Sequence, residues 1–123
     1  MLRPMTRLLI LAMLSAATPA AAQARFNATA QAGIGEPVRL GPLKVTPLTV
    51  VEDSRCPQMV TCVWRGRLRI IAAVGGANRV TLDDGVPLSV RGGRLTLVRA
   101  TPLSQHGEKV GPRRYRFILR YQR

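Results

Sequence analysis

The chain has 123 residues, the length of a single domain, and 46% of them are hydrophobic, which argues against a disordered protein. Its 19 Lys and Arg residues outnumber 6 Asp and Glu residues, giving a formal net charge of +13. The resulting positive potential favours anionic partners such as lipid head groups, acidic polysaccharide or nucleic acid, but it also serves solubility alone. Charge by itself therefore identifies no ligand.

Residues 1–22 have the features of a removable export signal. Two arginines precede an apolar run over residues 8–17, and small residues allow cleavage after Ala22 or after Ala24. The alternative, an uncleaved membrane anchor, needs about 20 apolar residues, and polar residues and a proline interrupt this run. We expect cleavage, no transmembrane segment in the mature chain, and a periplasmic or secreted location.

After the signal, residues 23–35 are rich in Ala and Gly, and we expect a flexible segment there with room for an edge strand at 26–30. A single β domain should then occupy residues 36–123. Alternation of apolar and polar residues predicts strands at 37–40, 43–51, 62–74, 79–83, 86–90, 94–100 and 113–122.

Glycine, proline and aspartate punctuate these strands at turn-like spacings. Because proline cannot donate to a ladder, Pro47 makes 43–51 an edge strand or a strand with a bulge. The predicted fold class is all-β, an antiparallel β-sandwich or open barrel of about seven short strands, preceded by an N-terminal signal helix.

Two strands have an especially regular apolar face. In the strand at 62–74 the face holds Trp64, Leu68, Ile70, Ala72 and Val74. In the last strand it holds Tyr115, Phe117, Leu119 and Tyr121. Because side chains alternate along a strand, we expect these residues to form much of the core.

The only two cysteines, Cys56 and Cys62, predict a structural disulfide in an exported protein. A redox pair and a metal site are the alternatives, but the spacing is not Cys-x-x-Cys and few further ligands exist. We predict neither a metal nor a cofactor. We expect Trp64 to pack on the disulfide, with exposed ligand stacking as the alternative, and Asp53 to cap the turn through its own backbone.

Arginines alternate along the same two strands, away from their apolar faces. If the strands are neighbours, the two rows merge into a basic patch that would attract an anion; otherwise they form a solvated face. Few aromatic residues lie among them, which argues against a platform for single-stranded nucleic acid. The candidate anion-binding residues are Arg65, Arg67, Arg69, Arg114, Arg116 and Arg120.

No catalytic set is evident in the sequence. His106 is the only histidine, and Ser104 nearby does not complete a triad, so we interpret His106 as a solvated loop residue. We predict that the protein is not an enzyme.

The cysteine region resembles a motif of small uncharacterised exported bacterial proteins. The segment Asp-Ser-Arg-Cys-Pro at 53–57 and the Cys-Val-Trp-x-Gly segment at 62–66 carry this resemblance, with a later Leu-x-x-Ala-x-Pro segment at 97–102. The resemblance implies export, a disulfide and a β domain, and it transfers no catalytic residue.

Three functional hypotheses follow. The first is a non-enzymatic binding or accessory module of the bacterial envelope, whose partner is an anionic envelope component or another exported protein. The second is an anion-binding envelope protein that uses the arginine-rich strand face. The third is a thiol-redox protein or another enzyme centred on Cys56 and Cys62.

Overall fold

The computed structural model describes residues 16–17, 25–105 and 109–123. Apart from residues 16–17, the predicted export signal and its cleavage sites lie outside the described residues, and so does His106. The described part of the chain contains no helix long and apolar enough to cross a membrane.

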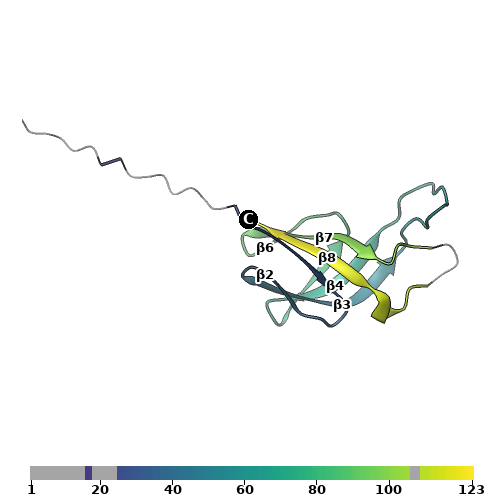
Figure 1. Ribbon diagram of the computed structural model, residues 1–123, viewed down its shortest axis with the longest axis horizontal. Coiled ribbons are helices and arrows are strands. Elements are labelled where there is room, and N and C mark those ends of the chain that lie inside the picture. The colour runs from purple at the N-terminus through teal and green to yellow at the C-terminus, as the bar shows by residue number, and fades with distance from the viewer. Residues whose placement is uncertain (1–15, 18–24, 106–108) are drawn as a thin grey trace, which may run out of the picture.

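Two four-stranded antiparallel sheets form a β-sandwich, as the sequence predicts (Figure 1). One sheet has the strand order β1-β8-β7-β6 and the other has the order β2-β3-β4-β5. We call them the β8 sheet and the β4 sheet. The described elements are β1 (Asn27–Ala32), β2 (Val38–Leu40), β3 (Leu43–Asp53), β4 (Leu68–Val74), β5 (Asn78–Asp83), β6 (Leu88–Val90), β7 (Gly93–Thr101), the 3-10 helix η1 (Pro112–Arg114) and β8 (Arg116–Gln122).

The core lies between the two sheets and follows the predicted alternation. On the β4 side it contains Leu68, Ile70, Ala72 and Val74, and on the β8 side Tyr115, Phe117, Leu119 and Tyr121, all at most 5% exposed. Because successive strand residues point to opposite faces, the outward positions between them remain for solvent or for a ligand.

The expectation of a flexible segment at 23–35 is wrong for residues 27–32. They form β1, which pairs along its length with β8 at the edge of the β8 sheet. The edge strand for which residues 26–30 left room is therefore present, at 27–32. Ala28 and Ala30 pack against the core and Ala32 is fully buried, so these small residues serve the sandwich.

Pro47 lies in an interior strand, so the edge-strand option is wrong and the bulge option is confirmed. The register between β3 and β4 shifts between Pro47 and Thr49. This shift accommodates the missing N–H of proline within a central strand. The carbonyl oxygen of Pro47 accepts a hydrogen bond from Gly35 N at 2.7 Å.

The strand predicted at 62–74 begins only at Leu68, in β4. The residues before it belong to a loop, at 54–67, that joins β3 to β4 and projects from the end of the sandwich away from the C terminus (Figure 1). Val86, the first residue of the strand predicted at 86–90, likewise lies outside β6 and is exposed.

Candidate functional site

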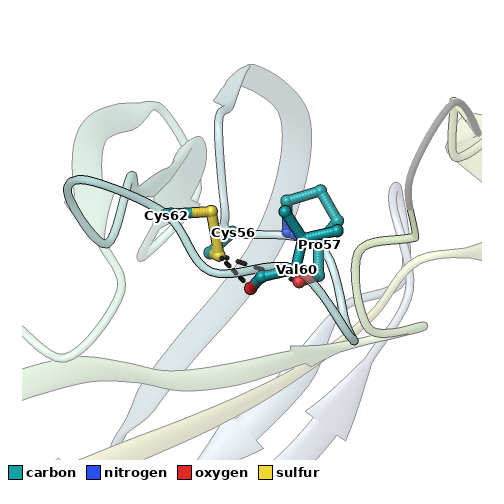
Figure 2. Close-up of a disulfide and its surroundings, with 4 residues drawn as sticks. All are labelled: Cys56, Pro57, Val60 and Cys62. Carbon is teal, nitrogen blue, oxygen red and sulfur yellow. Dashed lines mark hydrogen bonds between the residues drawn. A yellow bond between two sulfur atoms is a disulfide. The ribbon is translucent and has the colours of Figure 1, made fainter.

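The predicted disulfide is present: Cys56 and Cys62 are bonded within the loop at 54–67 (Figure 2). The chain curls around it, so that Cys56 Sγ lies 3.4 Å from Val60 O and 3.7 Å from Pro57 O. A disulfide sulfur has no proton to donate, so these are close packing contacts. The bond therefore closes a small ring at the end of the loop.

The part of the loop next to the strands, which we call the loop base, is held by a network of charged hydrogen bonds. Arg55 donates to both carboxylate oxygens of Asp53, at 2.7 and 2.8 Å, and the Tyr115 hydroxyl donates to Asp53 Oδ2 at 2.7 Å. Arg55 also donates to Ala100 O at 3.1 Å. Asp53 thus joins the loop to both sheets. Its carboxylate also accepts a hydrogen bond from the backbone of Arg55, so the expected turn cap is one part of a larger network.

The network shifts the pKa values of its members. Burial alone would raise the pKa of Asp53, but hydrogen bonds from Arg55 and Tyr115 outweigh it and lower that pKa below its ordinary value. Burial, together with the hydrogen bond to Asp53, raises the pKa of Tyr115 to about 12. Both groups therefore keep their ordinary charge states at neutral pH, which suits a structural role.

Gly66 completes the loop base. Its φ is +66°, and a Cβ there would lie 1.7 Å from the backbone oxygen of Ser54. Only glycine fits this close approach. The neighbouring hydrogen bonds from Ser54 N to Arg67 O and from Cys56 N to Arg65 O then close the two sides of the loop.

The other end of the loop, which we call the loop tip, is apolar and exposed. It consists of Met59, Val60, Val63 and Trp64. Met59 and Val63 are fully exposed, and Trp64 exposes 77% of its surface. The expectation that Trp64 packs on the disulfide within the core is wrong, because the strand predicted to begin at residue 62 begins only at Leu68.

The condition under which the two arginine rows would merge is not met, because β4 and β8 belong to different sheets. The first row also breaks up, since only Arg69 lies on a strand. Its Nε is 2.6 Å from Asp83 Oδ1, and Arg67 Nε is 2.9 Å from Glu52 Oε2. The Arg69 guanidinium lowers the pKa of Asp83. Arg67 and Arg69 are thus each paired with a carboxylate.

The second row finds different neighbours on the outer face of the β8 sheet. Arg120 lies opposite Thr29 on β1 and Thr96 on β7. Arg99 lies opposite Ile118, and Arg94 opposite Gln122, which places both on the same outward face. We call Arg94, Arg99, Arg116 and Arg120 the arginine face.

No acidic residue occurs in any strand of this sheet, as the sequences of β1, β6, β7 and β8 show. Arg116 donates to the backbone oxygens of Arg113 and Tyr115, and no ion pair involves Arg94, Arg99 or Arg120 among the residues that the structure describes. Like charges side by side on a sheet repel each other. The arginine face is therefore suited to binding an anion.

A hollow of about 700 Å³ continues this face at the β6–β7 hairpin and is lined in part by Arg91, Arg94 and Arg123. The Arg123 guanidinium donates to Arg91 O at 3.1 Å and lies 5.9 Å from the Tyr121 ring centroid, so its position is defined. This corner adds concave basic surface to the flat face.

Of the six candidate anion-binding residues, the structure places Arg116 and Arg120 on the arginine face. Arg114 lies in η1, just before β8. Arg65, Arg67 and Arg69 lie at the loop and on the β4 sheet. Sequence reasoning missed Arg94 and Arg99, although the alternation in β7 with Leu95 and Leu97 inside was a sufficient signal for Arg94.

Comparisons with protein-family models, curated proteins and solved structures found no match. The resemblance carried by the cysteine region therefore stays a prediction. The structure gives its residues physical roles nonetheless, since Asp53, Arg55, the two cysteines and Gly66 all shape the loop.

Proposed function

We propose that this protein is a non-enzymatic binding module that recognises an anionic surface through the arginine face. The observation that carries the proposal is a sheet with four outward arginines and no acidic residue in any of its strands. An intramolecular disulfide is typical of proteins that fold in an oxidising compartment, which supports a location in the bacterial envelope or outside the cell.

The chemistry of the ligand follows from the guanidinium group. Arginine pairs with the planar oxygens of phosphate and carboxylate through two parallel hydrogen bonds, and it does so from an exposed surface. An extended face with several such groups fits a repeating anion better than a single small one. A lipid surface and an acidic polysaccharide both meet this requirement, because each carries repeated phosphate or carboxylate groups.

The test is binding across a salt series, with anionic vesicles in one arm and an acidic polysaccharide in the other. The variant carries Arg94→Ser, Arg99→Ser and Arg120→Ser. Each arginine near an anionic surface contributes about 1 kcal/mol, so we expect affinity to fall by about a hundredfold at low salt.

A matched control removes three positive charges from the β4 sheet, with Arg39→Ser, Lys44→Ser and Arg79→Ser. If binding depends on the arginine face, this control binds far better than the first variant. Equal losses in the two variants would show that only net charge matters, and absence of wild-type binding in both arms would refute the proposal. The arm that binds identifies the source of the anion.

A further inference from the structure

The loop tip is a surface that the fold does not use. Met59 and Val63 are fully exposed, Trp64 is 77% exposed and Val60 is 43% exposed, so this end of the molecule presents a convex apolar knob to solvent. Large apolar side chains gathered at one exposed point usually mark an interaction surface. The neighbouring loop, which contains the exposed Leu103, is tied to the tip by a hydrogen bond from Gln58 N to Ser104 O at 2.9 Å.

The backbone holds this knob outward at some cost. Met59 has a φ of +63°, a left-handed conformation that non-glycine residues rarely adopt. The disulfide and the hydrogen bonds of the loop base fix the chain on either side of it. A rigid apolar tip loses little conformational freedom when it is buried in a partner, which favours binding.

Convex shape and nearby charge together indicate the kind of partner. A projecting apolar group fits a medium that deforms around it, and tryptophan is enriched where a protein meets the lipid–water interface. Arg65, which follows Trp64 directly, is exposed, so a positive charge stands next to the apolar tip. The net charge of +13 complements an anionic membrane.

We propose that the loop tip inserts into the interface of a lipid bilayer that contains anionic lipids, with Trp64 as its deepest anchor. An apolar element of this kind enters about 5–10 Å into the boundary between head groups and acyl chains. The inference deepens the proposed function by naming a membrane as the anionic surface, and it relies on that function only for the charge that attracts the protein.

Trp64 is the only tryptophan in the chain, so its fluorescence reports on the loop tip without a label. The experiment titrates the oxidised protein, with its N terminus established by mass spectrometry, with vesicles of 70% zwitterionic and 30% anionic phospholipid. We expect a blue shift of the emission and quenching by lipids brominated near the head group. Purely zwitterionic vesicles should give a much smaller change, because the attraction of charge is absent.

Two variants test the residues themselves, without changing net charge. Met59→Ser with Val63→Ser leaves the fluorescent Trp64 in place. Because burial of one apolar side chain of this size raises affinity by about ten- to a hundredfold, we expect vesicle affinity to fall by at least tenfold. The control is Val51→Ser with Val86→Ser, which removes two exposed valines outside the tip and should bind as the wild type does.

The outcomes separate this inference from the proposed function. Unquenched Trp64 emission in protein that is bound to vesicles would overturn the insertion and leave the arginine face intact. Quenching that survives the arginine substitutions unchanged would support insertion while contradicting the arginine face. If the tip variant binds vesicles as well as the wild type does, the tip is not a membrane anchor, and a protein partner with a matching pocket becomes the explanation for its exposure.

Discussion

The base and the tip of the disulfide loop lie within a few residues of each other, yet the fold uses them in opposite ways. At the base, the side chains of Asp53 and Arg55 are only 16% and 14% exposed and bond to each other, while Tyr115 bonds to Asp53. At the tip, Met59 and Trp64 contribute almost nothing to the core. The comparison teaches that stability and recognition are separable within one short segment.

Gly66→Ala should be the most damaging change at the loop base. The new Cβ would meet Ser54 O at 1.7 Å in a backbone conformation with positive φ, so the two sides of the loop must move apart. We expect the free energy of unfolding to fall by about 3 kcal/mol, measured by urea denaturation.

Gly85→Ala is the matched control, because Gly85 has a φ of +76° but no atom within 4 Å of the new Cβ. Only the conformational cost of about 1 kcal/mol should remain there. Equal losses at both glycines would show that the close approach to Ser54 is unimportant.

Removal of the disulfide by Cys56→Ser with Cys62→Ser acts on the boundary between base and tip. For a closed loop of about seven residues, the chain-entropy estimate gives a loss of about 2.4 kcal/mol. Thermal denaturation of the wild type with and without reductant provides an independent measurement. An unchanged melting temperature would mean that the base network alone holds the loop.

Tyr115→Phe should have a smaller effect, because Asp53 keeps both hydrogen bonds from Arg55. Loss of one buried hydrogen bond to a charged group costs about 1.5 kcal/mol. Tyr121→Phe serves as the control, since it removes a hydroxyl that donates to the backbone oxygens of Val90 and Arg91, accepts a long hydrogen bond from Arg123 and has no contact with Asp53. The free energies of unfolding of both variants are measured by urea denaturation. A larger loss in Tyr121→Phe than in Tyr115→Phe would argue against a central role for the Asp53 network.

The pH dependence of stability should reveal the same network. The pKa of Asp53 is lowered in the folded protein, so its contribution is complete above the ordinary value of about 3.9 and declines as pH falls below it. The pKa of Tyr115 is raised to about 12, so its contribution is complete below about 10 and is lost as pH rises toward 12. Unfolding experiments at both extremes test this, and Tyr115→Phe should lack the alkaline decline.

The smallest effect on stability is expected at the tip. Met59→Ser with Val63→Ser removes fully exposed side chains, so the free energy of unfolding should change by less than about 0.5 kcal/mol. A loss comparable to that of the disulfide variant would erase the distinction between base and tip. Combined with weaker vesicle binding, an unchanged stability would sharpen it.

Much of the fold follows from local pattern, and the errors have a common cause. Leu68 to Val74 and Tyr115 to Tyr121 alternate with the period of a strand and are buried as predicted. Trp64 fits the same alternation, but pattern does not show where a strand begins. The start of this strand is set by Gly66, whose close approach to Ser54 depends on three-dimensional packing.

The candidate site was harder to predict because it depends on strand order. The alternation of side chains along a strand is enough to place Arg116 and Arg120 on an outward face. Only the strand order separates them from Arg69 and places them beside Arg99. Compensation is also a property of register, since Asp83 neutralises Arg69 because β5 lies beside β4. No spacing along the sequence reports such a pairing.

The pairing of β1 with β8 also has a consequence for the order in which the chain folds. Asn27 lies opposite Gln122, so one edge of the β8 sheet joins the two ends of the domain, whereas the disulfide spans a sequence separation of only 6. Contacts so distant along the chain form late, because a long loop must close first. During synthesis, β1 and β7 must therefore wait for the last strand to emerge, and a nascent chain that stops before Arg116 lacks the strand that unites them.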